Sequence, residues 1–453
     1  MKIVSFHAAI AVFLSVTAWT QDATTMGKTD PQIAAALKQV SVKQIQANIE
    51  KLVSFQTRLT ISAQDAAAIA AGHGIGAARE WIKSEFQRYS RDCGGCLEVK
   101  TDSFTEPAGP RIPQPTVLTN VYAVLKGNDP GAANRIVLVT GHYDSRNTDV
   151  SDVSGFAPGA NDDASGTAVS MECARVLSKL KFRGTIIFLA VAGEEQGLNG
   201  SRHFAQKAKS DGWNIEAALN NDIVGGDRSA QQDTGVVRVF SEGVPGTATE
   251  AELRTIRGLG GENDSPSRQL ARSVAQVART YDTGIKPMLI FRLDRYLRGG
   301  DHISFNQQGF TAVRFTEYRE NYNHQHQNVR TENGVEYGDL PKFVNFDYVA
   351  NVTRTNAATL ASLASAPSPP GNVRLLTKDL ENSTTLTWDA TPGVEGYEVL
   401  WRATSSPEWE HAKSAGNATR ATLPIAKDNV IFAVRAVDDQ GHCSLPIVPQ
   451  PER

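Results

Sequence analysis

The sequence is poor in cysteine and methionine, with four residues of each among 453, and it has no strong charge excess. Lys and Arg number 46 against 49 Asp and Glu, which leaves a net charge of −3. A chain without a basic excess has no electrostatic pull toward nucleic acid or an anionic membrane. After Trp19, no apolar run approaches the ~20 residues of a membrane-spanning helix. We therefore expect no nucleic-acid partner and no stable membrane span in the mature chain.

One apolar stretch of some length stands at the N-terminus, where Met1 and Lys2 lead into apolar residues through Trp19. A single positive charge, a short apolar segment and small or polar residues after it are typical of a signal peptide. We take residues 1–21 as the signal peptide and expect an exported protein, periplasmic or extracellular. An N-terminal anchor that is retained is the alternative.

Four cysteines are too few for a disulfide-dense scaffold. Cys93 and Cys96 form a Cys-x-x-Cys motif, which could be a redox pair, half of a zinc knuckle or a tight structural disulfide. The sequence has no second Cys-x-x-Cys to complete a knuckle, and the motif does not open a helix after a strand. We expect a disulfide between them. Cys173 lies on an apolar helical face and is expected to be a free core thiol, and Cys443 belongs to another part of the chain.

Two adjacent carboxylates, Glu194 and Glu195, follow an apolar run. The run spans 185–192 and ends at Gly193, which predicts a buried strand of a parallel sheet. Open α/β sheets place their ligand sites at the carboxyl ends of such strands. Two neighbouring negative charges repel, and a divalent metal ion would relieve the repulsion, leaving one carboxylate free as a general base. A solvated helix start, where Glu suits the helix dipole, is the alternative.

Similar residues end other apolar runs. A second strand candidate, 135–140, leads into His142 and Asp144, and a carboxylate can orient a metal-binding imidazole from behind. Asp222 closes a third short apolar run, and residues 321–327, with two histidines, follow a fourth.

A Gly-rich turn at 158–166 holds Asp162 and Asp163 and leads into a helix expected over 167–180. Either aspartate could simply cap that helix. In chain order the candidates are therefore His, Asp, Glu-Glu, Asp and His. A dizinc site needs oxygen and imidazole ligands, one bridging carboxylate and an open position for water, and this set supplies them.

These motifs resemble those of the M28 zinc peptidases, a family that includes secreted bacterial leucyl aminopeptidases. The resemblance runs from about Val42 to about Leu363. It is carried by GHYDS at 141–145, APGANDDASG at 157–166, AVAGEEQGLNGS at 190–201, NND at 220–222 and GGDHISFNQQG at 299–309.

The resemblance implies an α/β fold of three layers, α/β/α, around a mostly parallel mixed sheet. It also implies two Zn²⁺ ions as cofactors, with Asp162 as the carboxylate that bridges both. His142 and Asp222 would bind the first ion, while Glu195 and the last histidine would bind the second. The family often shows a cis peptide after the bridging aspartate, here between Asp162 and Asp163.

The same resemblance implies that Glu194 is the general base and that Asp144 orients His142. The final family motif usually reads Tyr-His-Thr, whereas this chain has His324-Gln325-His326-Gln327. We take His326 as the ligand, from its place after Tyr322 and Asn323, and His324 is the alternative. His302 could support the site or be a core histidine, and the basic run 292–298 could face a substrate carboxylate or solvent.

The C-terminal part of the chain has a different character. We expect a catalytic domain over 32–364, a Pro/Ser linker at 365–370 and an alternating, strand-rich domain over 371–450. Short strands separated by turns indicate a small antiparallel all-β sandwich, which resembles a fibronectin type III domain. Its role is open. Residues 227–264 are rich in Gly, Thr and acidic residues, and we expect a loop or insertion near the site.

The sequence thus indicates a secreted dizinc metallo-exopeptidase, an aminopeptidase acting on peptide or protein substrates with a free N-terminus. One alternative is another zinc enzyme on this scaffold, such as a glutaminyl cyclase with one metal or a carboxypeptidase. Another is a catalytically inactive binding protein, against which the filled ligand positions argue.

Overall fold

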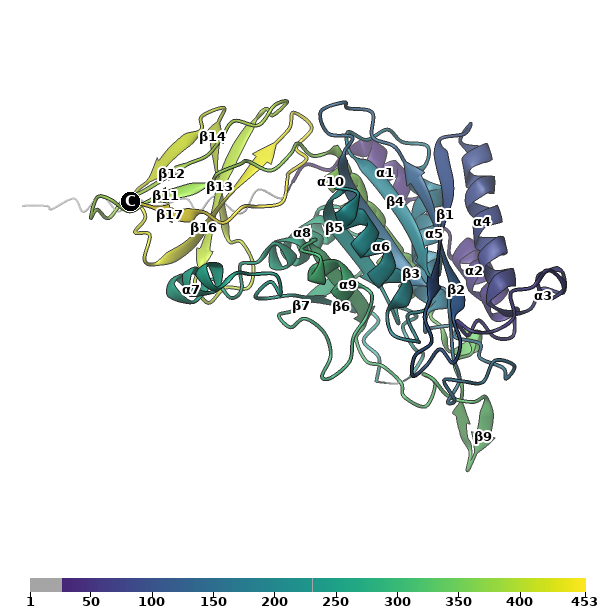
Figure 1. The fold of residues 1–453 in the computed structure, drawn as a ribbon. Helices are drawn as coiled ribbons and strands as arrows, with labels where there is room; N and C mark the ends of the chain where they lie inside the picture. Colours follow the sequence, from purple (N-terminus) through teal and green to yellow (C-terminus); the bar gives the residue numbers. More distant parts are fainter. Residues whose placement is uncertain (1–26, 230) are drawn as a thin grey trace, which may run out of the picture.

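A central sheet of eight strands organises the larger part of the molecule (Figure 1). The computed structural model describes residues 27–229 and 231–453, so the predicted signal peptide lies outside the described residues. The strand order is β1-β2-β4-β3-β5-β8-β6-β7. The strands are β1 (Leu97–Glu106), β2 (Thr116–Leu125), β3 (Arg135–His142), β4 (Thr185–Val191), β5 (Asn214–Asn221), β6 (Val236–Ser241), β7 (Lys286–Ile290) and β8 (Ala312–Glu317).

The four central strands β4, β3, β5 and β8 run parallel to one another. Strands β2 and β6 flank them in the antiparallel direction, and β1 and β7 close the two edges. Every residue of β3, β4 and β8 is buried. Such continuous burial is typical of strands that helices cover on both faces. Because the four central strands are parallel, their carboxyl ends meet at one edge of the sheet.

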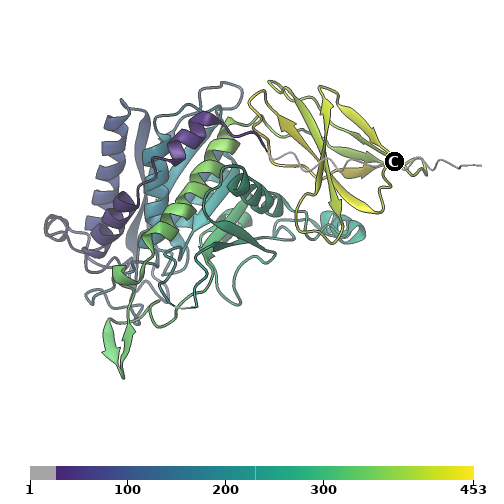
Figure 2. The same ribbon diagram turned by 180° about the vertical axis from the view of Figure 1, so that it is seen from behind.

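Helices form a layer on each face. The helices of the molecule are α1 (Pro31–Leu37), α2 (Val42–Val53), α3 (Ala66–Ala70), α4 (Gly74–Asp92), α5 (Ala164–Leu177), α6 (Asn199–Ser210), α7 (Glu250–Leu259), α8 (Pro266–Thr280), α9 (His302–Gln307), the 3-10 helix η1 (Pro341–Phe343) and α10 (Phe346–Ser365), of which α7 and α3 bury no residue. Helices α2, α5 and α10 pack together on one face, and α6 and α9 lie on the other (Figures 1 and 2).

The alternation of side chains along the strands explains the two layers. Val137 and Val139 of β3 join the core under α5 and α10, while Leu138 between them joins the core under α6 and α9. Sequence signals fix the helix starts: Ser41 caps α2 through the amide of Gln44, and Ser265 caps α8 ahead of Pro266. The predicted three-layer α/β/α fold with a mixed sheet is confirmed.

The C-terminal region forms two small sheets, one of strands β15-β12-β11-β17 and one of β14-β13-β16 (Figure 2). The strands are β11 (Arg374–Leu376), β12 (Thr384–Thr387), β13 (Gly396–Ala403), β14 (His411–Gly416), β15 (Arg420–Leu423), β16 (Val430–Val437) and β17 (Gln450–Glu452). Leu386, Trp388, Tyr397 and Phe432 lie in the core that the region encloses. The predicted antiparallel pairing holds except between β11 and β17, which run parallel.

The prediction of a loop or insertion over 227–264 is wrong. This segment contains β6, which lies within the large sheet between β8 and β7, and helix α7. The Gly and Thr residues of this segment flank the strand, whereas β6 itself reads Val-Val-Arg-Val-Phe-Ser and has the β-branched residues typical of a strand. Two small strands, β9 (Arg330–Glu332) and β10 (Val335–Tyr337), form a hairpin that projects from the molecule (Figure 1).

The cysteines behave as expected. Cys93 and Cys96 form a disulfide, with their Cα atoms 5.7 Å apart, and Cys173 is a buried free thiol. Cys443 is also free and lies in the C-terminal region. Over residues 27–229 and 231–453, no helix combines the length and apolarity that a bilayer crossing requires.

Candidate metal centre

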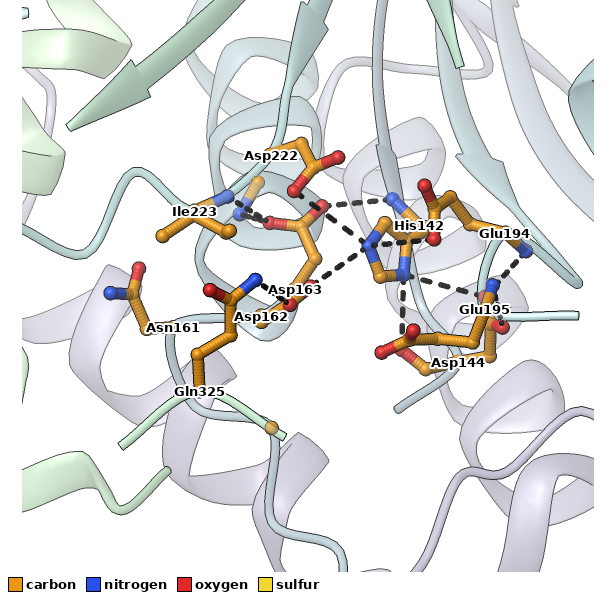
Figure 3. A network of polar contacts seen from close by, with 12 residues as sticks. His142, Asp144, Asn161, Asp162, Asp163, Glu194, Glu195, Asp222, Ile223 and Gln325 are labelled. Atoms are coloured by element: carbon orange, nitrogen blue, oxygen red, sulfur yellow. Dashed lines mark hydrogen bonds and ion pairs between the residues drawn. The ribbon is translucent and has the colours of Figure 1, made fainter. Parts of the chain in front are cut away.

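Polar side chains converge where the parallel strands end (Figure 3). His142 is the last residue of β3, and Asp222 immediately follows β5. Glu194 and Glu195 come three and four residues after the end of β4. Strands β3 and β5 are neighbours and run parallel, so His142 and Asp222 lie side by side although they are 80 positions apart in the chain.

The turn between β3 and α5 gives its two aspartates different tasks. Asp163 caps α5 by accepting the amide of Gly166 at 2.9 Å, and its other oxygen accepts the amide of His142 at 2.9 Å. Asp162 faces the opposite way, with Oδ1 3.1 Å from Nε2 of His142. The peptide bond between the two aspartates is cis, as the family resemblance implies. Of the two candidates for the helix cap, the structure therefore selects Asp163.

The candidate ligands form two clusters, in each of which the ligand atoms lie within 4.8 Å of one another. In the first, Nε2 of His142 is 4.0 Å from both Asp222 Oδ1 and Glu194 Oε2. In the second, Nε2 of His326 is 2.8 Å from Asp162 Oδ2 and 2.9 Å from Glu195 Oε1. Asp162 turns one oxygen to each cluster, which is the position of a bridging carboxylate.

The structure separates the two histidines of the 321–327 loop. His326 points to Asp162 and Glu195, and its backbone φ of 53° is left-handed. His324 forms an ion pair with Asp227 and stacks on Phe343, with ring centroids 3.6 Å apart. The described geometry thus brings His326, and not His324, to the metal clusters.

Asp144 lies behind His142 and is held from several sides. Its backbone oxygen is 3.1 Å from Nδ1 of His142, and its Oδ1 is 3.4 Å from the same nitrogen. Thr60 donates to Oδ2 at 2.7 Å, and the amides of Glu194 and Glu195 donate to the carboxylate at 3.3 and 3.1 Å. Burial opposes ionisation of Asp144, but the hydrogen bond and charge of His142, together with the hydrogen bonds from Thr60 and Glu195, outweigh it and lower its pKa. Asp144 therefore remains an anion that orients His142 and ties the Glu194-Glu195 loop to β3.

The titratable groups of the centre differ in the direction of their net pKa shift. Burial, together with the charges of Asp222 and Glu195, raises the pKa of Glu194 well above its usual value. Burial acts in the same direction on Asp162, but His326 and His142 outweigh it and bring its pKa well below its usual value. Burial also opposes protonation of His326, yet Glu195 and Asp162 raise its pKa to about 10. The centre as a whole thus favours bound positive charge.

Three candidate ligand atoms of this centre are buried and make no hydrogen bond of good geometry: Nε2 of His142, Oε1 of Glu195 and Nε2 of His326, the last two of which lie 2.9 Å apart. Buried polar atoms rarely remain unpaired. Nitrogen and carboxylate donors at this spacing suit a divalent ion such as Zn²⁺, and Asp162 offers one oxygen to each of two ions. The donor set therefore fits two metal ions.

Other residues that the sequence singled out lie outside the clusters. His302 is buried, and its Nε2 is 2.9 Å from the backbone oxygen of Leu293, so it is a core histidine. In the basic run 292–298, Arg295 and Arg298 pair with Glu320 at 2.8 and 2.7 Å. Arg295 and Arg298 are therefore held by the protein, whereas Arg292 is exposed.

Sequence reasoning missed several side chains that contact the centre. Arg146 pairs with Glu195 at 2.9 Å, and Arg314 pairs with Asp222 at 2.9 Å. Gln325 donates to Asp162 at 3.0 Å (Figure 3). Asp339 accepts the amide of Asp162 at 2.7 Å. Arg146 directly follows the GHYDS motif, so its position was a usable signal, whereas Arg314 and Asp339 reach the centre only through the tertiary fold.

The sequence of this chain is similar to those of known metallopeptidases. Residues 120–336 match the sequence profile of peptidase family M28. A probable zinc metalloprotease of Leptosphaeria maculans is 47% identical over 93% of this chain and 97% of its own length. A probable zinc metalloprotease of Pyrenophora teres is also 47% identical, over 93% of this chain and 87% of its own length.

Solved structures share the fold. The aminopeptidase LapA of Legionella pneumophila superposes with a TM-score of 0.52 and 23% identity, over 74% of this chain and 75% of its own. LapB of the same organism superposes with a TM-score of 0.50 and 20% identity, over 76% and 78%. The identity to the two curated fungal proteins extends over nearly the whole chain and includes the strands that carry the clusters. The chain therefore belongs to peptidase family M28.

Proposed function

We propose that this chain is a zinc-dependent aminopeptidase that holds two Zn²⁺ ions and removes the N-terminal residue from peptides. The observation that carries the proposal is the pair of clusters joined by Asp162, whose two oxygens face Nε2 of His142 and Nε2 of His326. Relatives named as probable zinc metalloproteases support zinc as the metal.

The ligands would divide between two positions. His142 and Asp222 would hold one ion, Glu195 and His326 the other, and Asp162 would bridge them. Glu194 is within 4.0 Å of His142 and belongs to the first cluster by distance. We nevertheless assign it the role of general base, because the remaining residues already supply each ion with three protein ligands, as catalytic zinc sites have.

The bound ions would activate a water molecule and polarise the scissile carbonyl. Glu194 would take a proton from the attacking water and pass it to the leaving amine. Its partly buried carboxylate has a raised pKa in the free protein, which suits a group that both accepts and returns a proton. Asp144 would act by holding His142 and, through the amides of residues 194 and 195, by fixing the base.

Restriction to the first residue would come from the metal centre. The free N-terminal amine of the substrate would be received on one metal side of the centre, and an acetylated amine, whose nitrogen lone pair is delocalised into the amide, would lose that interaction. The test compares one peptide in free and N-acetylated form, each with and without a chelator. We expect release of the first residue from the free peptide alone, and only with metal present.

Each of the other outcomes of this assay would indicate a different enzyme or an inactive protein. Release of the last residue from the acetylated peptide indicates a carboxypeptidase. Cyclisation of an N-terminal glutamine indicates a glutaminyl cyclase. No reaction, with less than one equivalent of zinc in protein that was never chelated, indicates an inactive binding protein.

We also propose that the protein is exported after removal of residues 1–21. The Cys93–Cys96 disulfide is compatible with an oxidising compartment. We retain the proposed domains: catalytic over 32–364, a linker at 365–370 and a fibronectin type III-like domain over 371–450. N-terminal sequencing of the protein recovered outside the cells of its source checks the export proposal, and an N-terminus at Met1 contradicts it.

A further inference from the structure

Three guanidinium groups share one carboxylate beside the candidate metal centre. Arg238, Arg295 and Arg298 pair with Glu320 at 2.9, 2.8 and 2.7 Å. Arg295 has a second carboxylate in Asp294. Among the ion pairs of residues 27–229 and 231–453, Arg238 and Arg298 have Glu320 alone. This group of side chains therefore keeps a surplus of positive charge.

Arg298 is the member of the group that is open to a ligand. Its side chain is 31% exposed, against 9% for Arg295 and 19% for Arg238. Within the described residues, Nη1 alone of its guanidinium nitrogens donates a hydrogen bond, to Glu320. A guanidinium presents five donors in a planar fork, so Nε and Nη2 can still donate to a ligand. Because Glu320 already holds the group, little side-chain freedom remains to be lost on binding.

The fold places Arg298 between segments that carry ligands of both clusters. The next residue, Gly299, accepts a hydrogen bond from Arg314, which pairs with Asp222 at 2.9 Å. On the other side, the guanidinium carbon of Arg298 lies 5.9 Å from the ring centroid of Tyr322. Tyr322 belongs to the loop that ends in the histidine of the second cluster. The free donors of Arg298 therefore border the metal centre.

The electrostatics agree with this position. Burial opposes the charge of Arg298, but Glu320, Asp162 and Asp222 outweigh it and raise its pKa. Arg298 therefore stays charged and lies within electrostatic reach of ligands from both clusters. Asp162 and Asp222 face the metal positions, and neither accepts a hydrogen bond from Arg298.

We propose that Arg298 binds a carboxylate of the substrate, either in the side chain of the first residue or at the C-terminus of a dipeptide. Guanidinium and carboxylate match because they form paired, charge-assisted hydrogen bonds. The inference rests on the proposed function and narrows its substrate class. The enzyme favours peptides that carry this second charge over neutral peptides of the same shape.

Three peptides separate the two sources of the carboxylate. The amide of Asn-Ala has no carboxylate, the amide of Asp-Ala has one in its first side chain, and free Asn-Ala has one at its C-terminus. We measure kcat/KM of the full-length mature protein for each. One acid-bearing peptide should exceed the Asn-Ala amide by about tenfold or more, the usual size of a charge-assisted hydrogen bond. The preferred peptide identifies the source.

Variants test whether Arg298 causes the preference. Arg298→Gln removes the charge and should bring the ratio of kcat/KM values close to one, while Arg298→Lys keeps the charge without the fork and should give an intermediate ratio. The matched control is Arg292→Gln, on the same loop. Arg292 donates to the hydroxyl of Tyr296 at 2.9 Å and pairs with no carboxylate in the described part of the chain. This control should keep the wild-type ratio.

The outcomes distinguish this inference from the proposed function. Failure to hydrolyse any of the three peptides overturns the proposed function, and the inference with it. Where the peptides are hydrolysed, the inference alone is overturned if the wild type prefers neither acid-bearing peptide, if folded Arg298→Gln keeps the wild-type ratio, or if Arg292→Gln lowers it equally. Thermal unfolding checks that each variant is folded, and the wild-type ratio and Arg298→Lys decide if Arg298→Gln does not fold.

Discussion

Two regions of the molecule bury charged side chains, and they do so differently. At the metal centre, carboxylates and imidazoles converge and leave Nε2 of His142 and Nε2 of His326 without partners. At the contact between α8 and the C-terminal region, Arg402 and Arg272 meet Asp264 at 2.6 and 3.6 Å. Both arginines are 2% exposed, and Asp264 is 5% exposed in its side chain.

The arginines of this contact are largely satisfied by the protein itself. Arg402 donates to the backbone oxygen of Ser406 at 2.7 Å, and Arg272 donates to those of Pro407 and Asn263 at 2.7 and 2.9 Å. The atoms left over are donors, whereas at the metal centre the unpaired atoms are candidate ligand atoms of the two clusters. Buried charge alone therefore does not identify a functional site; converging ligand atoms without partners do.

The largest effect is expected from Glu194→Gln. If Glu194 moves the proton and does not bind metal, the variant should lose about 10²–10⁴-fold in turnover while keeping both ions. Turnover on an unblocked peptide and metal content by elemental analysis are measured on the same preparation. Turnover near the wild-type value contradicts the role of base, and loss of one ion shows that Glu194 is a ligand.

A large effect on stability, without one on catalysis, is expected from Asp264→Asn. The substitution keeps the shape but leaves two buried arginines without their carboxylate, and breaking a buried pair in this way costs about 3–5 kcal/mol. Urea unfolding should show the loss in the transition of the C-terminal region, while metal content and turnover stay at wild-type values. A fall in turnover of the folded protein would mean that the two regions are functionally coupled.

The sequence predicted the parts of the centre that depend on local pattern. Apolar runs that stop abruptly marked the ends of β3, β4 and β5, and the parallel sheet then brings His142, Glu194 and Asp222 together. The order of the strands could not be read locally, since β6 lies between β8 and β7 although β8 comes last of the three in the chain. Each apolar run predicted where a strand ends, but only the order of the strands in the sheet determines which of these ends are neighbours.

The choice between the two histidines and the contacts of the arginines also required the fold. His324 is occupied because Asp227 and Phe343, from separate parts of the chain, happen to flank it. Arg314 and Asp339 touch Asp222 and the amide of Asp162 only because β8 and the chain after β10 return to the same edge. Such contacts have no periodic signature in a sequence.

A smaller, pH-dependent effect is expected at the C-terminal region. Nε2 of His442 is 3.2 Å from Asp30 and Nδ1 is 2.9 Å from Asp438. Burial opposes protonation, but the two aspartates outweigh it and raise the pKa of His442. Because the pKa of His442 is higher in the folded than in the unfolded protein, its protonation stabilises the fold. This stabilisation is complete below the pKa of the unfolded state, about 6.5, and is lost as the pH rises through the pKa of the folded state.

Melting temperatures measured between about pH 6 and pH 9 test this expectation. The wild type should lose stability relative to His442→Gln as the pH rises, and the difference should be greatest at the acidic end. Parallel curves for the two proteins would show that His442 does not titrate differently in the folded and unfolded states.

The smallest effect is expected from Glu408→Gln, at the same contact as Asp264. Glu408 pairs with Arg279 at 2.7 Å, but the two side chains are 36% and 51% exposed, so water and salt screen the pair. Exposed pairs contribute about 0–1 kcal/mol, and we expect a change in unfolding free energy within that range that shrinks further in high salt. Asp264→Asn and Glu408→Gln each remove one negative charge from the same contact. The ratio of their changes in unfolding free energy therefore measures what burial adds to an ion pair. Equal effects would mean that the contact is hydrated in solution and that its charges, unlike those of the metal centre, are not held away from water.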